Sequence, residues 1–373
     1  MKAVTVDPQR EQIGLAEVPE PELTAATGVR LRTLEVGVCG TDREIARFEY
    51  GSPPPGDDAL VLGHEALAEV VDVGPGVSSL APGDLAVPMV RRPCEHSDCR
   101  PCRAGRQDFC ATGDYSERGI KEAHGFMTEL FVDDERYLHR VPAALRDCAV
   151  LVEPLTIAEK ALAEVWEIQR RLPWVDLDAG LGEPGRGLTA VVLGAGPVAQ
   201  LGAMALVRRG FSTWVYSRSP APNEKSAVVE AIGATYISSE LLSPAELAEQ
   251  VGNIDLVYEG SGASKLAFDV LGVLGTNGLF AFTGVPGHGP PAEIDTDALM
   301  RTMVLGNQVA LGTVNAGFDS FEEAIADLEA FSERWPDAVR ALISARHPMD
   351  DHRELLLGRP GGIKHVVAVA EGA

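Results

Sequence analysis

The sequence predicts a two-domain α/β protein, in which a mainly β, barrel-like domain precedes a doubly wound parallel sheet. Three observations support this prediction. The first 150 residues contain short β-type runs separated by Gly and Pro turns, as in antiparallel or barrel-like domains. From about residue 190, apolar strands alternate with helical segments, which is typical of a parallel sheet covered by helices. At 373 residues, the chain is also longer than one hydrophobic core usually spans.

The first domain is expected to consist mostly of strands. Residues 1–6 and 66–73 are β-type runs, and the second run is followed by a Gly-Pro-Gly turn. The pattern becomes helical after about residue 154, where apolar residues recur at helical spacing up to 168. We place this domain at residues 1–189.

The second domain, at residues 190–306, follows a β-α-β order. Residues 188–193 form a continuous apolar run, residues 198–209 are helical, and residues 213–216 form the next strand. Further strands are expected at 254–258 and 278–282, which predicts a parallel sheet. The tail, residues 307–373, contains two helical segments and a final strand near 365–367, and we expect it to return to the first domain.

Charge and composition exclude several classes of partner. Lys and Arg total 32 against 55 Asp and Glu, so the net charge is -23 and the surface repels nucleic acid and anionic lipid. The sequence has neither a signal-peptide pattern nor an apolar run of the roughly 18 residues that span a bilayer. We therefore expect a cytoplasmic protein that acts on a small molecule, and whose cysteines are metal ligands or free thiols.

A glycine-bearing turn predicts a dinucleotide site. Gly194, Gly196, Pro197 and Val198 lie between a strand and a helix, where glycines allow a pyrophosphate to approach the amino end of the helix. Ala199 replaces the third glycine of the usual pattern. A purely structural turn is the alternative, but the strand-helix-strand order around it favours a nucleotide.

The end of the next strand indicates which nicotinamide cofactor fits. An acidic residue there would hold the ribose 2'-hydroxyl and repel a 2'-phosphate, but the chain has Ser217, Arg218 and Ser219. Hydroxyls and a guanidinium suit a phosphate, so NADP is favoured, with NAD possible. In the alternative interpretation, Arg218 is only a solvated surface charge.

Two short segments carry ligands for a catalytic zinc ion. Cys39 precedes His64 and Glu65 by 25 and 26 residues, and together they offer sulfur, nitrogen and oxygen donors. A catalytic zinc uses three such protein ligands and leaves one position open. The alternative is a buried core cysteine beside a histidine that is satisfied by hydrogen bonds.

Four further cysteines predict a structural zinc site. Cys94, Cys99, Cys102 and Cys110 follow the spacing C-x4-C-x2-C-x7-C and supply enough thiolates for a tetrahedral ion. An empty reduced site, a site in which His96 replaces a cysteine, and an iron–sulfur cluster are the alternatives. Cys148 lies among apolar neighbours and is expected in the core.

These motifs together resemble the zinc-dependent medium-chain dehydrogenase/reductase superfamily over nearly the whole chain, and within it the archaeal-type glucose dehydrogenases. The segments that carry the likeness are residues 37–44, 63–65, 113–121, 124–126, 153–155 and 314–316. Two positions depart from the pattern. The first cysteine spacing is x4 where the superfamily usually has x2, and Val90 stands where related enzymes can place a polar sugar-binding residue.

The resemblance implies a GroES-like catalytic domain, a Rossmann domain and further site residues. It makes Cys39, His64 and Glu153 the ligands of the catalytic zinc, with Glu65 able to enter or leave the metal shell, and Thr41 a proton relay. It assigns the sugar hydroxyls to Glu117, Glu153 and Asn307. It also places two further segments against the nicotinamide and a lysine near the cofactor phosphates. The first segment is Phe282, Thr283 and Gly284, the second is Leu305, Gly306 and Asn307, and the lysine is Lys364.

The activity that the resemblance implies is oxidation of an aldose at C1. Zinc would lower the pKa of the anomeric hydroxyl, and the C1 hydride would pass to NADP to give the lactone. Helix capping by Thr41, and a surface salt bridge of Glu117 with Arg118 or Lys121, are the alternatives for those two residues. A polyol dehydrogenase, or an inactive NADPH-binding protein, remains the competing function. The resemblance also implies a homo-oligomer, either a dimer or a tetramer.

Overall fold

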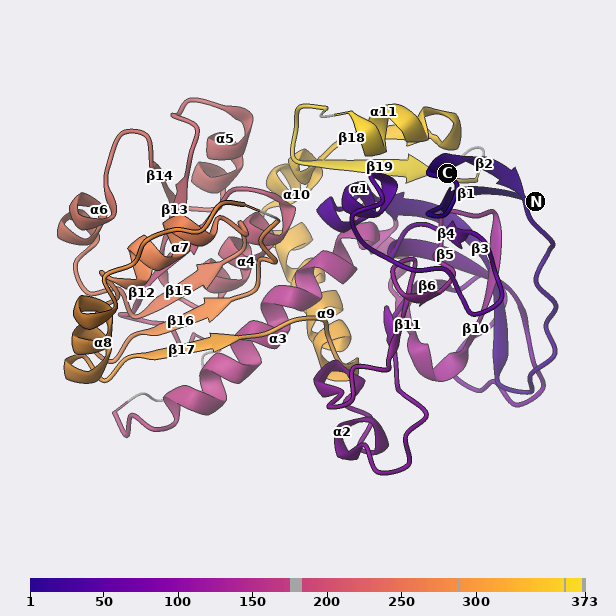
Figure 1. The fold of residues 1–373 in the computed structure, drawn as a ribbon, viewed down its shortest axis with the longest axis horizontal. Helices are drawn as coiled ribbons and strands as arrows, with labels where there is room; N and C mark the ends of the chain where they lie inside the picture. The colour runs from indigo at the N-terminus through magenta and orange to yellow at the C-terminus, as the bar shows by residue number, and fades with distance from the viewer. Residues whose placement is uncertain (175–182, 288, 359, 371–373) are drawn as a thin grey trace. The chain divides into compact units, whose positions relative to one another are not determined.

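The computed structural model describes residues 1–174, 183–287, 289–358 and 360–370 (Figure 1). The chain divides into two compact units. The first unit comprises residues 1–156, 315–334 and 343–373, and the second comprises residues 157–314 and 335–342. Among the described residues, no helix has both the length and the apolar character required to cross a membrane.

The first unit is mainly β structure. Its largest sheet has the order β11-β6-β5-β3-β19-β18, with β10 paired to β3, and two smaller sheets have the orders β2-β1-β4 and β7-β8-β9. Its strands are β1 (Lys2–Asp7), β2 (Gln12–Glu17), β3 (Gly28–Gly37), β4 (Leu60–Val61), β5 (Glu65–Val73), β6 (Leu85–Pro88), β7 (Arg91–Arg92), β8 (Ser116–Arg118), β9 (Glu122–Ala123), β10 (Leu130–Asp134), β11 (Leu138–Val141), β18 (Ile343–Pro348) and β19 (Lys364–Ala368).

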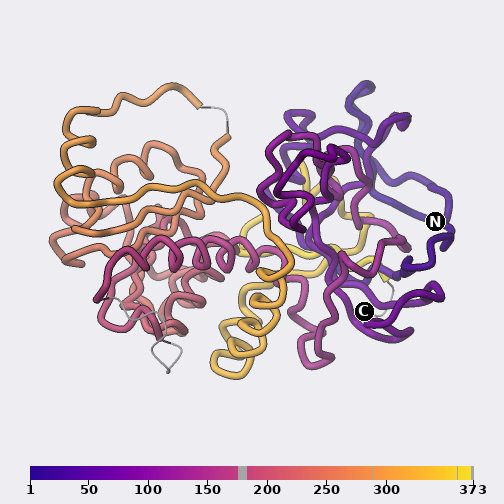
Figure 2. The backbone as a smooth tube through the Cα atoms, turned by 90° about the horizontal axis from the view of Figure 1, so that it is seen from below, coloured from indigo at the N-terminus to yellow at the C-terminus, as the bar shows by residue number. Residues whose placement is uncertain are grey.

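The carboxyl-terminal segment completes the large sheet of the first unit. In Figures 1 and 2 the yellow terminal strands lie among the indigo ones, because β19 pairs antiparallel with β3, and β18 pairs parallel with β19. Alternating apolar residues of β1, β3 and β5 form the core of this unit. The helices assigned to it are α1 (Gly40–Ala46), α2 (Arg100–Arg103), α9 (Phe318–Arg334) and α11 (His352–Leu357).

The second unit is a parallel sheet with the order β14-β13-β12-β15-β16-β17, which confirms the predicted α/β class. Its strands are β12 (Thr189–Leu193), β13 (Ser212–Ser217), β14 (Thr235–Ser238), β15 (Leu256–Glu259), β16 (Leu279–Phe282) and β17 (Val309–Gly312). Its helices are α4 (Pro197–Arg208), α5 (Glu224–Ala231), α6 (Pro244–Val251), α7 (Ser264–Leu271), α8 (Thr296–Leu305), α10 (Pro336–Leu342) and most of α3 (Val152–Gln169).

The strand order places a topological switch point between β12 and β15. From β12 the chain moves outward through β13 and β14, then returns to β15 on the other side of β12 and continues outward through β16 and β17. Helix α4 packs on β12, β13 and β15. In such sheets, ligands bind beyond the carboxyl ends of the strands at the switch point. The glycine turn that follows β12 lies at this position.

Candidate active site

Three predicted metal ligands lie together in the first unit. Cys39 directly precedes α1, while His64 and Glu65 lie at the start of β5. One donor atom from each of the three residues lies within 4.8 Å of the others. His64 and Glu65 are 5% and 1% exposed, so water is almost absent around two of the three donors. A thiol, an imidazole and a carboxylate at this spacing fit a zinc ion.

The backbone before His64 is held by close glycine packing. Gly63 has φ +89°, a conformation that side-chain-bearing residues rarely adopt, and its carbonyl oxygen accepts a hydrogen bond of 2.9 Å from the Phe126 N–H. A Cβ atom on Gly125 would collide with this carbonyl. The glycines of the two segments therefore allow the turn to place His64 next to Cys39.

Asp42 contacts two of the candidate ligands, which the sequence did not suggest. Its carboxylate accepts a 2.8 Å hydrogen bond from the Cys39 N–H and lies 3.2 Å from Nδ1 of His64, which leaves Nε2 for a metal. Burial alone would raise the pKa of Asp42, but His64 and the Cys39 N–H outweigh burial and lower it. The sequence signal for this contact was the position of Asp42, three residues after Cys39 and in the first turn of α1.

Glu65 is paired with Lys364 at the base of the cluster. Nζ of Lys364 contacts Oε2 of Glu65 and donates to the Val38 carbonyl oxygen at 3.3 Å. Burial alone would lower the pKa of Lys364, but the charges of Glu65 and Cys39 outweigh it and raise the pKa. The side chain is 2% exposed, so its charge is committed to Glu65. Within the first unit Lys364 is thus bound to Glu65, and its expected place near the cofactor phosphates stays a prediction.

Glu153 and Thr41 lie in the same unit with different relations to the cluster. Glu153 is at the start of α3 and 8% exposed, and burial, partly opposed by His64, raises its pKa to about 7. Its carboxylate lies outside the set of donor atoms within 4.8 Å of one another. Thr41 is half-buried in α1, whose N-cap is Cys39, so Thr41 does not cap this helix. None of the described residues hydrogen-bonds its hydroxyl.

The four cysteines of the predicted structural zinc site are also brought together. Their sulfur atoms all lie within 4.8 Å of one another, with 3.7 Å between Cys94 and Cys102 and 4.0 Å between Cys99 and Cys110. Zn–S bonds of about 2.3 Å place tetrahedral sulfurs roughly 3.8 Å apart, so the geometry fits zinc despite the x4 spacing. Hydrogen bonds from the Cys102 and Ala111 N–H groups lower the pKa of Cys99, as suits a thiolate ligand.

Glu117 is buried and paired with a residue that the sequence analysis missed. It is 5% exposed, and its carboxylate lies 2.9 Å from a terminal nitrogen of Arg91. The two alternative partners are engaged elsewhere, since Arg118 faces Asp133 and Lys121 donates to the Gly113 carbonyl. The only sequence signal was the arginine pair of β7, which faces β8 across the small sheet.

The glycine turn of the second unit leaves an open cradle at the start of α4. Gly196 is the N-cap of this helix, and a Cβ atom there would meet nothing within 4 Å. The amino end of the helix therefore has free space and unpaired N–H groups where a pyrophosphate is expected. Ala199, which replaces the third glycine, packs against Gly260. The residues present fit a dinucleotide.

Ser217, Arg218 and Ser219 lie at the carboxyl end of β13, next to the strand that leads into the glycine turn. The Ser238 hydroxyl holds the Arg218 carbonyl at 2.6 Å and thereby fixes the local backbone. The Arg218 side chain is exposed, and none of the described residues binds its guanidinium. A cation at this place fits a ribose 2'-phosphate.

Phe282 ends β16, and Thr283 and Gly284 follow it at the same edge, where a buried carboxylate ties two loops together. Glu259, at the end of β15, is 1% exposed and accepts from the N–H groups of Ser261, Gly262 and Gly284 at 2.7, 2.8 and 3.1 Å. The Thr283 hydroxyl donates to the Glu259 carbonyl at 2.6 Å. Glu259 thus fixes the loops after β15 and β16, a role absent from the sequence analysis.

Leu305, Gly306 and Asn307 lie at the opposite edge of this sheet, which corrects their assignment to the nicotinamide and the sugar. They end α8 and precede β17, and the Gly306 carbonyl accepts from the N–H of Asn277, just before β16 begins. The amino ends of β16 and β17 are a full strand length from Phe282. Asn315, which follows the carboxyl end of β17, instead donates to Glu117 at 3.1 Å.

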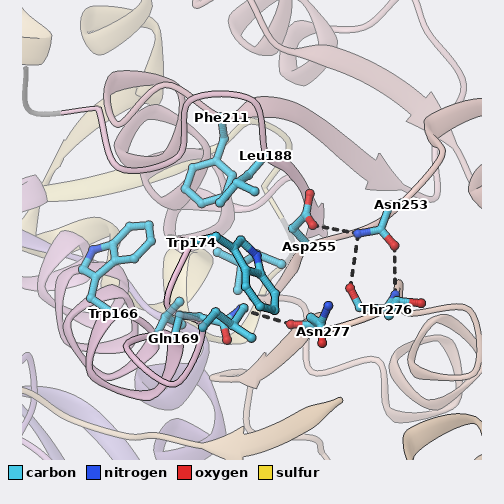
Figure 3. Close-up of a pocket in the computed structure, with 12 residues that line it drawn as sticks. Trp166, Gln169, Trp174, Leu188, Phe211, Asn253, Asp255, Thr276 and Asn277 are labelled. Carbon is cyan, nitrogen blue, oxygen red and sulfur yellow. Dashed lines mark hydrogen bonds between the residues drawn. The ribbon is translucent and has the colours of Figure 1, made fainter. Parts of the chain in front are cut away.

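A cavity of about 290 Å³ also lies at the amino edge of the second-unit sheet (Figure 3). Trp166, Trp174 and Phe211 form its aromatic side, and its polar groups bind one another: Asn253 bonds to Asp255 and Thr276. Because the glycine turn is at the other edge, this cavity is not the candidate cofactor site.

Comparison with known proteins covers the whole chain. A family model described as "Glucose dehydrogenase C-terminus" matches residues 146–369, and one described as "Alcohol dehydrogenase GroES-like domain" matches residues 25–143. Glucose 1-dehydrogenase of Thermoproteus tenax is 39% identical over 373 residues, covering 99% of each chain. That of Methanocella arvoryzae is 34% identical over 370 residues, again covering 99% of each.

A solved structure has the same fold throughout. Haloferax mediterranei glucose dehydrogenase, in complex with NADP, zinc and gluconolactone, superposes with a TM-score of 0.87. It is 31% identical, and the match covers 99% of both chains.

Proposed function

Because this chain belongs to the glucose dehydrogenase family of the zinc-dependent medium-chain dehydrogenases, we propose that it oxidises an aldose, glucose first, at its anomeric carbon with NADP as the hydride acceptor. The Haloferax relative was solved with NADP, zinc and gluconolactone, the product of that reaction. The observation that carries the proposal is the donor set of Cys39, His64 and Glu65, which the structure brings within 4.8 Å of one another.

Cys39, His64 and a glutamate would hold the catalytic zinc, with Glu65 and Glu153 the available carboxylates. Bound zinc supplies Lewis-acid chemistry that lowers the pKa of a hydroxyl. The Asp42 carboxylate, 3.2 Å from Nδ1 of His64, would favour the tautomer that leaves Nε2 for the metal, and the buried surroundings would exclude competing water. The half-buried hydroxyl of Thr41 is free to accept the anomeric proton and pass it on.

Glu117 and Glu153 are the acceptors for sugar hydroxyls in this proposal, and the carboxyl edge of the second-unit sheet is the cofactor site. The start of α4 would bind the pyrophosphate at Gly196, and Arg218 would bind the 2'-phosphate of NADP. Replacing Arg218 by Ala should reduce the preference for NADP over NAD, since the phosphate loses its only cationic partner among these residues. An unchanged preference would assign the selectivity to other groups.

Cys94, Cys99, Cys102 and Cys110 would hold a second, structural zinc. Their sulfur spacings of 3.7 and 4.0 Å support this assignment, and their distance in sequence from Cys39 makes the two sites separately testable. Metal analysis of the purified protein should give two zinc ions per chain, one of which is lost in the Cys110→Ala variant.

We also propose that the protein is a homo-oligomer that assembles through the β17 edge of the second unit. Met300, Val304 and Leu305 of α8 are 65%, 70% and 73% exposed, and β17 is the last strand of its sheet (Figure 1). Exposed apolar patches and open strand edges are typical of interfaces. Light scattering should give a dimer or tetramer, and Val304→Asp should convert it to a monomer.

One assay decides the activity. Aldoses and polyols are tested with NADP and with NAD, and the reduced nicotinamide is followed by its absorbance. Oxidation of glucose to gluconolactone with NADP is the expected result. Activity confined to polyols would support a polyol dehydrogenase with the same metal ligands, and NADPH binding without oxidation of either class would support an inactive binding protein.

A further inference from the structure

We propose that Arg91, assisted by Asn315, is a specificity-determining positioning residue that holds one oxygen of the Glu117 carboxylate and thereby presents the other to a single sugar hydroxyl. This inference rests on the proposed function, because it assigns the substrate contact of Glu117 to one atom. Arg91 does not touch the sugar in this arrangement. It acts through the carboxylate that it orients.

The donors around Glu117 all converge on Oε1. Nε of Arg91 donates to it at 3.0 Å, a terminal guanidinium nitrogen lies at 2.9 Å, and the Asn315 amide donates at 3.1 Å. Oε2 accepts from none of the described residues, although it is not sealed from solvent. An ionised carboxylate can accept several hydrogen bonds, so Oε2 is an acceptor with its capacity unused. Oε1 is thus occupied by protein donors, whereas Oε2 is free to accept a hydrogen bond from a substrate.

Arg91 cannot readily turn away from this position. It is 4% exposed, and its remaining terminal nitrogen donates to the Asp108 carbonyl at 3.2 Å. Its guanidinium carbon lies 3.7 Å from the centre of the Tyr115 ring, which covers one face of the group. A planar fork fixed on three sides sets the rotation of the carboxylate that it binds, which a lysine cannot do.

Asn315 is fixed independently of Glu117. Its backbone has φ +60°, which asparagine tolerates better than most residues, and its Oδ1 accepts from the Ala316 N–H at 2.8 Å. This bond determines the orientation of the amide, so the NH2 group faces Glu117. Arg91 precedes Glu117 in the chain, whereas Asn315 comes from the segment after β17, and the two hold Oε1 from separate parts of the first unit.

A single charged acceptor with a fixed direction should select one hydroxyl position. A sugar that lacks that hydroxyl leaves Oε2 without a donor in the complex, and sites built to bind a hydroxyl reject such analogues strongly. Removal of one hydrogen bond to a charged group should lower kcat/KM by a factor of roughly 10 to 150. Losses at the other hydroxyl positions should not depend on Arg91.

The test compares glucose with its 2-, 3-, 4- and 6-deoxy analogues, using zinc-loaded protein and saturating NADP. The wild type should oxidise one of these analogues much more slowly than glucose. If this analogue lacks the hydroxyl that Glu117 binds, the difference should disappear in Glu117→Gln. Arg91→Met and Asn315→Ala should reduce the same discrimination to within about threefold, chiefly by lowering activity on glucose. Arg91→Lys should not restore it, because one ammonium cannot replace the fork.

Arg92→Met is the matched control, since Arg92 is the neighbouring residue of β7 but pairs with Asp133. It should keep the full discrimination even if it unfolds at a lower temperature, and NADPH affinity and zinc content should be unchanged in every variant. If Asn315→Ala and Arg91→Lys retain the wild-type discrimination while Glu117→Gln loses it, the inference is wrong. A wild type that oxidises no aldose would instead overturn the proposed function.

Discussion

Replacing Lys364 by Met separates two roles that this residue could have. The structure places its ammonium group against the Glu65 carboxylate, and the two side chains are only 2% and 1% exposed. A cofactor-phosphate role would require the same charge to bind NADP. If the Lys364 charge is committed to Glu65, the variant should lose stability while its affinity for NADPH stays within about twofold of wild type.

The size of the stability loss follows from the burial of the pair. Removing one partner of a buried ion pair costs about 3–5 kcal/mol, since the other charge is left without compensation. For a domain of this size, 1 kcal/mol shifts the melting temperature by about 2–4 °C, so a drop of roughly 6–20 °C is expected. The drop should be larger after a chelator has removed zinc, because a bound cation offsets part of the charge left on Glu65.

The pH dependence of this loss has a definite sign. The pKa of Lys364 is raised above its ordinary value of 10.5, so the pair stabilises the fold fully below that value and is lost only as pH rises through the folded pKa. The difference in melting temperature between wild type and variant should therefore stay constant from about pH 6 to pH 9.

The assay is calorimetry or dye-monitored melting, combined with NADPH fluorescence titration. Lys265→Met is the control, because Lys265 also pairs with a carboxylate at 2.7 Å but is 72% exposed, and it should change stability by less than about 1 kcal/mol. Adding Glu65→Gln to Lys364→Met should recover much of the loss. A variant that melts like wild type but binds NADPH more than tenfold more weakly would refute the assignment.

Three further substitutions test the rest of the site. Gly284→Ala places a Cβ atom against the Gly262 backbone and the Glu259 carboxylate, so NADPH affinity and melting temperature should both fall. Gly287→Ala is the control, because its Cβ atom would meet nothing within 4 Å, and it should leave both quantities unchanged. Glu259→Gln turns an acceptor of several N–H groups into a partial donor and should cost about 1–3 kcal/mol in calorimetry, a prediction that an unchanged melting curve would contradict. Asp42→Asn should weaken binding of the catalytic zinc by about 10- to 100-fold in chelator competition, and no effect would mean that His64 needs no such partner.

Local patterns in the sequence were sufficient for the fold and for two groups of candidate metal ligands that the structure brings together. The continuous apolar run at 188–193 forms β12, and the helix expected at 198–209 is α4 (Pro197–Arg208). These signals succeed because strand burial, a glycine turn and a helix start are adjacent in the chain. The thiolates likewise lie in one short segment, so their spacing limits where they can meet.

Contacts between distant segments could not be predicted in this way. Lys364 reaches Glu65 across about 300 residues, and a buried ion pair leaves no periodic signal in either segment. The asparagine near β17 presents a different difficulty. Asn307 and Asn315 flank the same strand, and only the direction of that strand in the sheet decides which of them lies at its carboxyl end.

The charges around Cys39 explain why the cluster suits a divalent cation. A metal-bound thiolate at Cys39 and the carboxylates of Asp42 and Glu65 would contribute three negative charges, and Lys364 supplies one positive charge. Two negative charges then remain in a site with almost no water, which a zinc ion would balance. A fourth negative charge would be in excess, and burial raises the pKa of Glu153 to about 7. In the proposed zinc site, Glu153 would therefore be able to act as a proton donor or as a carboxylate, whereas Glu65 is held by Lys364.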